Sequence, residues 1–173
     1  PFGRGFPGWH IECSAMSQSL LGETLDIHTG GEDNIFPHHE CEIAQAEGAT
    51  GKPFVRYWMH ARHLMLDGGK MSKSLGNLYT IGQLEEMGHP PVAVRVALLR
   101  SQYRRVLNFT LDGLKEAASS VRRLRLFAEE MGLAAGGAEP AEPPPWVAAA
   151  VKRFDESMDD DLNTSGALDG VFT

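Results

Sequence analysis

The stretch that most constrains the fold is a short apolar run followed by a helical pattern, within residues 25–47. The run LDIHTGG, residues 25–31, is strand-like and ends in two glycines. The next segment, PHHECEIAQAE at residues 37–47, has a helical pattern, and Pro37 suits a first helical turn. A strand that leads into a helix is typical of α/β domains, so the predicted fold class is α/β.

Two carboxylates follow this strand in the stretch HTGGED, residues 28–33. Ligands of α/β sheets bind beyond the carboxyl ends of the strands, where a carboxylate can accept a hydrogen bond from a ribose hydroxyl. The same letters are also a common turn sequence. The residues alone leave a nucleotide site and an ordinary turn both open.

Beyond residue 90 the pattern becomes helical. Apolar residues spaced by three and four after Pro91 predict one amphipathic helix, which carries Val96, Leu99, Tyr103 and Val106. Thr110 is suited to cap a second helix. The apolar face of that second helix comprises Leu111, Leu114, Ala118, Val121, Leu124 and Ala128. Residues 132–146 are rich in Gly and Pro and predict a linker, after which a new helical pattern starts at Val147.

The charge is distributed unevenly. A net charge of -7 excludes a uniformly basic nucleic-acid binder, yet residues 92–126 hold eight Lys or Arg against Asp112 and Glu116 alone. Such a patch attracts phosphate backbones, although a solvated helix face has the same composition. The arginines that lie between the apolar stripes are Arg95, Arg100, Arg104, Arg105, Arg122, Arg123 and Arg125.

Features that the sequence lacks indicate the cellular compartment of the protein. It has no run of 18 apolar residues, and its first residues lack the layout of a signal peptide. Cys13 and Cys41 are the only cysteines, too few for a disulfide framework. We therefore expect a soluble, cytoplasmic protein that does not bind membranes.

The loop DGGKMSKSLGN, residues 67–77, places Lys70 and Lys73 among glycines and hydroxyls. A hairpin-like turn at residues 67–69 can bring the backbone close to a ligand. The two lysines and the serine hydroxyls suit a polyphosphate such as a nucleoside triphosphate. The alternative is a solvated surface loop.

A metal site is one interpretation of three residues. His38 and Glu42 are four residues apart, so a helix places them on the same face, and Cys13 can supply a thiolate. Sulfur, nitrogen and oxygen are all ligands that zinc accepts. In the alternative, His38 is a polar residue at a helix start and Cys13 a small buried hydrophobe.

Four stretches, taken in order, resemble the cysteinyl-tRNA synthetases, a family of class I aminoacyl-tRNA synthetases. They are PGWHIECSAMS, DIHTGGEDNIFPHHECEIAQAE, YWMHARHLMLDGGKMSKSLGN and MDDDLNT. The resemblance implies a ligase that activates cysteine with ATP to cysteinyl adenylate and then transfers the cysteine to tRNA(Cys). It implies zinc as cofactor, ATP with Mg²⁺ as substrate, and cysteine, ATP and tRNA(Cys) as partners.

The resemblance also implies roles for individual residues. Lys70 and Lys73 become catalytic residues on a mobile signature loop that closes on the ATP phosphates. The implied zinc ligands, which select the substrate thiol, are Cys13, His38 and Glu42. The remaining implied contacts are Trp9 with the amino acid, Gly31 and Asp33 with the ribose, Lys73 with the phosphates, and Trp58 and His60 with the adenylate.

The resemblance divides the chain into four parts. Residues 1–88 correspond to the C-terminal part of a Rossmann-like nucleotide-binding catalytic domain. Residues 89–131 form a helical stem-contact region, 132–146 the linker, and 147–173 the start of a helical tRNA-binding domain. We expect a fragment, inactive alone, that lacks the N-terminal half of the catalytic domain with its HIGH motif and a fourth zinc ligand. The alternatives are the cysteine ligase of mycothiol biosynthesis and a non-catalytic tRNA-binding fragment.

Overall fold

The computed structural model describes residues 3–6, 8–72, 76–132 and 144–172. The chain forms two compact units, Pro1–His63 and Leu64–Thr173, and each is considered by itself. Within the described residues, no helix is both long and apolar enough to cross a membrane.

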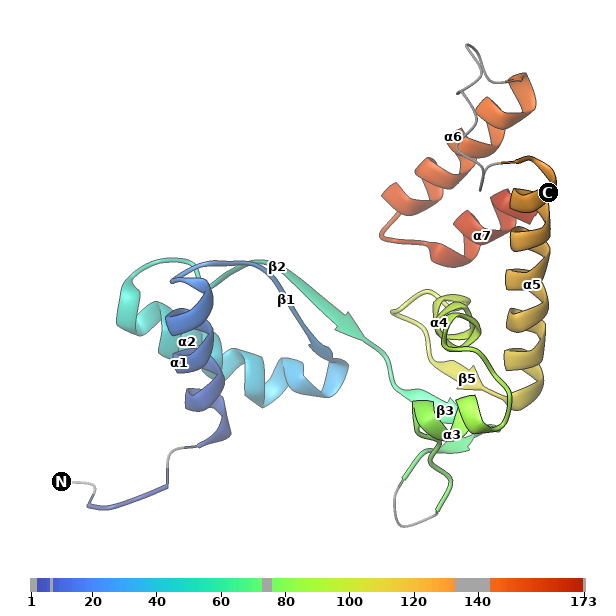
Figure 1. Cartoon of the computed structure of the whole chain (residues 1–173). Coiled ribbons are helices and arrows are strands. Elements are labelled where there is room, and N and C mark those ends of the chain that lie inside the picture. Colours follow the sequence, from blue (N-terminus) through green and yellow to red (C-terminus); the bar gives the residue numbers. More distant parts are fainter. Residues whose placement is uncertain (1–2, 7, 73–75, 133–143, 173) are drawn as a thin grey trace. The chain divides into compact units, whose positions relative to one another are not determined.

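The first unit is a strand–helix–strand arrangement with an additional helix. Its elements in order are α1 (Trp9–Leu21), β1 (Leu25–Gly31), the short turns η1 (Glu32–Asn34) and η2 (Ile35–His39), α2 (Glu40–Thr50) and β2 (Val55–Ala61). Strands β1 and β2 pair in parallel, with α2 in the connection between them and α1 packed against α2 (Figure 1). The predicted strand at residues 25–31 and the predicted α/β class are confirmed.

The regular helix α2 begins later than the sequence pattern predicts. The prediction placed Pro37 in its first turn, but α2 begins at Glu40 and Pro37 lies in the distorted turn η2. The residue before a proline is disfavoured in helical geometry, and Phe36 is accordingly extended, with φ -133° and ψ 132°. His39 already has helical angles, so His38 still lies one helical turn before Glu42.

The interior of this unit is unusually polar. Its buried apolar cluster consists of Leu25, Ala46 and Phe54. Among the residues that the structure describes, the buried polar or charged ones all belong to this unit and are Ser14, His38, His39 and Glu42. Buried polar groups cost free energy unless they find partners, so this concentration marks the candidate site.

The second unit combines a small sheet with helices. Its elements are β3 (Leu64–Leu66), β4 (Gly69–Lys70), α3 (Ile81–Glu86), α4 (Pro91–Leu99), β5 (Leu107–Phe109), α5 (Leu111–Glu130), α6 (Pro145–Asp159) and α7 (Thr164–Phe172). Strand β3 lies in the middle, antiparallel to β4 and parallel to β5. Asp67 and Gly68, which join β3 to β4, have φ values of 48° and 77°. Two successive positive φ values are typical of a two-residue hairpin, so the predicted turn is confirmed.

The core of the second unit lies between this sheet and helices α3, α4 and α5. Its buried members are Leu66, Leu84, Ala93, Val94, Ala97, Phe109, Leu114 and Ala117. The long helix α5 packs against α4 (Figure 1). The Thr110 side chain accepts a hydrogen bond of 2.9 Å from the Gly113 amide, which confirms the predicted cap.

The helix predicted to run from Pro91 through Val106 is shorter than its pattern suggested. Helix α4 ends at Leu99, so Tyr103 and Val106 lie outside it. The face that α4 buries consists of Ala93, Val94 and Ala97, small residues that allow close packing. The chain leaves the helix because β5 pairs with β3, a contact that local periodicity does not contain.

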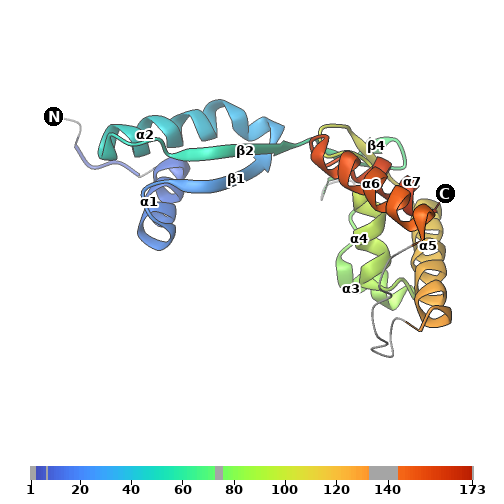
Figure 2. The same ribbon diagram turned by 90° about the horizontal axis from the view of Figure 1, so that it is seen from above.

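Helices α6 and α7 pack against each other at the end of the chain (Figure 2). Helix α6 begins at Pro145, slightly before the predicted start at Val147. Within the predicted linker, residues 133–143 lie outside the described residues. The predicted division into functional domains at residues 88, 131 and 146 stays a prediction.

Candidate metal centre and its surroundings

Three residues from different elements of the first unit come together. Cys13 of α1, His38 of η2 and Glu42 of α2 each offer one ligand atom, and these atoms lie within 4.8 Å of one another. His38 Nε2 is 3.0 Å from Glu42 Oε1. The structure thus gathers the three residues predicted to bind metal, and their role stays a prediction. We call them the Cys–His–Glu trio.

Glu42 is the least satisfied member of the trio. Its side chain is 0% exposed, and Oε2 accepts a hydrogen bond of 2.8 Å from His28 Nε2. Oε1 has no hydrogen-bond partner among the described residues, because the nearby His38 Nε2 lacks hydrogen-bond geometry despite the short distance. A buried carboxylate with an unsatisfied oxygen is costly, and a cation at Oε1 would relieve that cost.

The chemistry of the donor set fits zinc. A thiol, an imidazole and a carboxylate are the three side-chain types that zinc binds. Burial, and then the Glu42 charge, raise the pKa of the Cys13 thiol. Without a cation, Cys13 therefore stays a thiol at neutral pH, and metal binding would release its proton.

Histidines outside the trio form a network that the sequence interpretation did not predict. His10 Nδ1 lies 2.6 Å from His38 Nδ1, and His39 Nδ1 lies 2.8 Å from His60 Nε2. His28, His39 and Glu42 form a second group whose ligand atoms lie within 4.8 Å. Burial lowers the pKa of His39 to about 4, so this ring is neutral at physiological pH. The only signal in the sequence was that every histidine except His89 lies before residue 64.

Two tryptophans border this network. The Trp9 ring stacks on His38 with centroids 4.0 Å apart, while 59% of Trp9 remains exposed. Trp58 of β2 lies 4.7 Å from the His39 ring and stacks on His60 at 5.8 Å. Of the predicted substrate contacts, Trp9 and Trp58 therefore lie beside the histidine network, and His60 belongs to it.

The end of β1 allows close approach by neighbouring side chains. A Cβ atom on Gly30 would lie 2.6 Å from the His39 ring, and one on Gly31 would lie 2.3 Å from Asp33 Oδ1. Glycine is therefore required at Gly30 for the ring to lie where it does. Asp33, the predicted ribose contact, is exposed in η1, with His63 Nε2 at 3.9 Å.

The lysine-rich loop belongs to the second unit. Lys70 is exposed in β4, and Lys73 lies outside the described residues. The Asn77 side chain donates to the Lys70 carbonyl at 3.0 Å and accepts from the Ser72 amide at 2.9 Å. Asn77 thus ties the end of the loop to its beginning, a role that the sequence interpretation missed.

The arginines of the basic segment fall into two groups. Arg100 donates to Glu116 and Ser120, Arg104 donates to Asp161, and Arg123 lies over the Phe172 ring at 5.0 Å. Within the described part of this segment, the arginines whose side chains make neither an ion pair nor a ring contact are Arg95, Arg105, Arg122 and Arg125.

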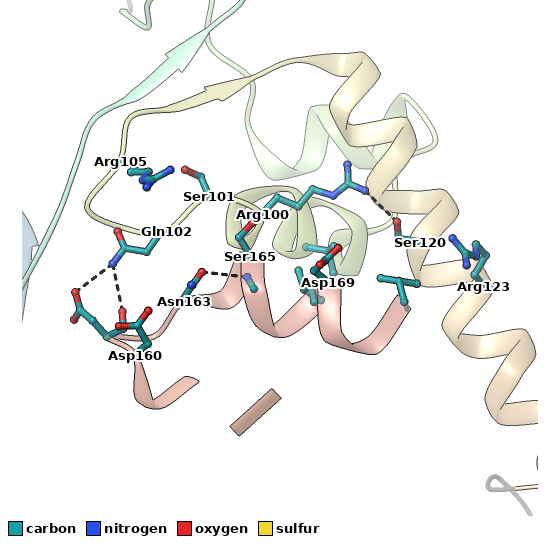
Figure 3. A pocket seen from close by; sticks show the side chains of 15 residues that line it. Arg100, Ser101, Gln102, Arg105, Ser120, Arg123, Asp160, Asn163, Ser165 and Asp169 are labelled. Carbon is teal, nitrogen blue, oxygen red and sulfur yellow. Dashed lines mark hydrogen bonds between the residues drawn. The ribbon is translucent and has the colours of Figure 1, made fainter. Parts of the chain in front are cut away.

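A pocket of about 950 Å³ lies in the second unit, bordered by α4, α5 and α7 (Figure 3). Its walls carry both charges, from Arg100, Arg105 and Arg123 and from Asp160 and Asp169. None of the predicted site residues line it. The mixed charge favours no ligand class, so we assign none to this pocket.

The chain is similar to proteins of known families. The family model described as the catalytic domain of class I tRNA synthetases (C) matches residues 1–119. The cysteine-tRNA ligase of Opitutus terrae is 54% identical over 173 residues, which is all of this chain and 36% of that protein. The cysteine-tRNA ligase of Chlamydia muridarum is 51% identical over 180 residues, covering 99% of this chain and 37% of that protein. The chain therefore spans little more than a third of the length of these relatives.

A solved structure has a similar fold. The LeuRS chain of a ternary complex with tRNA and LeuAMS from Agrobacterium radiobacter K84 superimposes with a TM-score of 0.64. The match covers 85% of this chain and 21% of that chain, at 18% sequence identity. At this identity the likeness concerns the fold alone.

Proposed function

Because the chain belongs to the family of class I tRNA synthetase (C) catalytic domains, we infer that it is part of a cysteine-tRNA ligase. Such an enzyme activates cysteine with ATP, releases pyrophosphate, and transfers cysteine from the adenylate to the terminal adenosine of tRNA(Cys). The names of relatives at 54% and 51% identity support this proposal. The cytoplasmic location predicted from the sequence is part of it.

The observation that carries the proposal is the Cys–His–Glu trio, with His38 and Glu42 buried and Glu42 Oε1 unsatisfied. A zinc ion bound there would supply a position that a cysteine thiolate fills well and a serine hydroxyl, which hardly ionises, fills poorly. A pocket that discriminates by shape alone separates such similar side chains by only about 1–3 kcal/mol.

Side chains of the chain itself fix the geometry around the proposed zinc ion. Glu42 and His38 are held by burial, so their donor atoms keep a fixed separation. Trp9 covers one face of the His38 ring and leaves much of its own surface available to a substrate. We propose that this exposed part of Trp9 contacts the bound amino acid.

The nucleotide is proposed to bind at the end of β1, as part of a Rossmann-like catalytic domain. In parallel sheets, ligands bind beyond the carboxyl ends of the strands, which is where Gly31 and Asp33 lie. The exposed Asp33 carboxylate would accept from a ribose hydroxyl, and Trp58 and His60 would lie near the adenylate. Lys70 and Lys73 would stabilise the charge that develops on ATP, bound with Mg²⁺, as pyrophosphate leaves.

The basic segment is proposed to contact the tRNA backbone, in a helical stem-contact region. Its support is the excess of arginine over carboxylate in residues 92–126. The four arginines that lack an ion pair or ring contact with the described residues are proposed to bind phosphates, whereas Arg100, Arg104 and Arg123 already have partners.

The test is made in the protein that carries these 173 residues. We expect cysteine-dependent exchange of pyrophosphate into ATP, and charging of tRNA(Cys) with cysteine. Exchange without charging would point to a cysteine ligase with another acceptor, such as the amino sugar of mycothiol synthesis. Absence of exchange, together with retained tRNA binding, would point to a non-catalytic tRNA-binding protein.

A further inference from the structure

Two histidines outside the Cys–His–Glu trio contact its members on the side away from the other ligands. His28 of β1 forms a hydrogen bond of 2.8 Å with Oε2 of Glu42, whereas the unsatisfied Oε1 of Glu42 faces His38. His10 of α1 forms a hydrogen bond of 2.6 Å with Nδ1 of His38, whereas Nε2 of His38 faces Glu42. Each histidine therefore occupies the atom that the candidate ion would not use.

These contacts determine where the protons lie if His38 binds a metal through Nε2. A ligating imidazole is neutral and must carry its proton on the other nitrogen, here Nδ1. His38 Nδ1–H then donates to His10 Nδ1, and His10 carries its own proton on Nε2. In the same way, His28 Nε2–H donates to Glu42 Oε2, since a carboxylate can only accept.

Hydrogen-bond geometry separates the role of His28 from that of His38. His28 Nε2 lies 2.8 Å from Glu42 Oε2 and has hydrogen-bond geometry. His38 Nε2 and Glu42 Oε1 are 3.0 Å apart without such geometry. His28 is thus placed as a hydrogen-bond donor and His38 as a ligand.

We propose that His28 and His10 are positioning residues of the metal centre: His28 directs Oε1 of Glu42 at the ion, and His10 fixes the tautomer in which Nε2 of His38 can bind it. This inference rests on the proposed zinc site of the cysteine-tRNA ligase and adds residues to it. Hydrogen bonds to the far atoms of metal ligands raise ligand basicity and fix ligand orientation.

The test compares zinc affinity, measured by competition with a chelator, in the protein that carries this chain. Removal of such hydrogen bonds typically lowers metal affinity by about 10- to 100-fold, and we expect that decrease in His28→Ala and in His10→Ala. His28→Gln, whose amide can still donate to Glu42, should recover most of the affinity. His63→Ala is the matched control, because His63 is an exposed histidine of the same unit. Its affinity should equal that of the wild type.

The failure of this inference is distinguishable from failure of the site itself. Cys13→Ala removes a ligand, so wild-type zinc affinity in that variant would overturn the proposed site. Weaker binding in Cys13→Ala together with wild-type affinity in His28→Ala and His10→Ala would overturn only the positioning roles. Binding of two zinc ions per wild-type chain, and of one in His28→Ala, would make His28 a ligand and also overturn its positioning role. Should His28→Ala fail to fold, a His28→Gln variant that folds but binds zinc as weakly as Cys13→Ala would contradict the proposal.

Discussion

Arg104 and Asp161 form an ion pair in the second unit, with Arg104 Nε 2.5 Å from Asp161 Oδ2. Tyr103 donates to Oδ1 of the same carboxylate at 2.6 Å, and Gln102 donates to Oδ2 at 3.2 Å. The segment between α4 and β5 therefore holds the turn between α6 and α7. Asp161 itself has a φ of 51°, a value uncommon for residues other than glycine, asparagine and aspartate.

We predict that Asp161→Asn destabilises the fold in a pH-dependent way. Asparagine tolerates the same backbone angle, so the variant removes the charge without new strain. Hydrogen bonds from Arg104 and Tyr103 lower the pKa of Asp161, so its stabilisation is complete above the usual carboxyl pKa. It is lost as the pH falls through the lowered value. Melting temperatures of both proteins should therefore converge in acid; a difference that is constant with pH would contradict this assignment.

The second prediction concerns the trio. Cys13→Ser and His38→Ala should each lose bound zinc, as measured by metal content after purification, because each removes a ligand. Cys41→Ser is the matched control, since Cys41 is also a half-buried free cysteine, one residue from Glu42. It should retain the metal. Unchanged zinc content in His38→Ala would remove His38 from the ligand set.

The third prediction concerns Asn77. Replacing it by alanine breaks two hydrogen bonds that close the lysine-rich loop, each contributing about 0.5–1.5 kcal/mol. We expect slower cysteine-dependent pyrophosphate exchange in Asn77→Ala. Asn77→Asp keeps the acceptor for the Ser72 amide and loses only the donor, so its rate should be intermediate. Equal rates in all three proteins would show that the loop does not need this contact.

The fourth prediction compares two leucines on α5. Leu114 is 0% exposed and Leu126 is 51% exposed. Leu114→Ala should lower the free energy of unfolding by about 2–5 kcal/mol, because it removes buried methyl groups and leaves a cavity. Leu126→Ala should change it by less than about 0.5 kcal/mol. Denaturant titration measures both, and similar decreases would place the core of this unit elsewhere.

The fifth prediction separates the two groups of arginines. Arg105→Gln with Arg122→Gln should weaken tRNA binding and flatten its salt dependence, by about 0.9 in log–log slope for each phosphate that is no longer neutralised. Cysteine-dependent pyrophosphate exchange without tRNA should stay unchanged. Arg104→Gln should instead act mainly on stability, because Arg104 is paired with Asp161. An unchanged salt slope in the double variant would make both arginines ordinary surface charges.

Local patterns predicted those parts of the fold that depend on neighbours in sequence. Thr110 and the spacing of Leu114 and Val121 predicted α5, since capping and helix periodicity are local. The same reasoning failed at Tyr103, because apolar spacing continued by coincidence beyond the end of α4. What ends that helix is the pairing of β5 with β3, which joins segments far apart in the chain.

Local patterns likewise predicted only those features of the candidate metal centre that depend on neighbours in sequence. The spacing of His38 and Glu42 is a helical relationship, so it could be read from the sequence. The contacts of His10 and His28 cross between α1, η2, β1 and α2, and no periodicity contains them. The sequence interpretation therefore named the ligand candidates without the hydrogen bonds that orient them.

The glycines at the end of β1 limit how this centre can change. Even a methyl group at Gly30 would collide with the His39 ring, so a substitution at this glycine would displace the ring. To change this centre, the histidine rings themselves would have to be replaced. The rings of His39 and His28 contact a second histidine and Glu42, respectively. A protein engineer who wants this centre to admit another metal would have to replace interacting side chains in pairs.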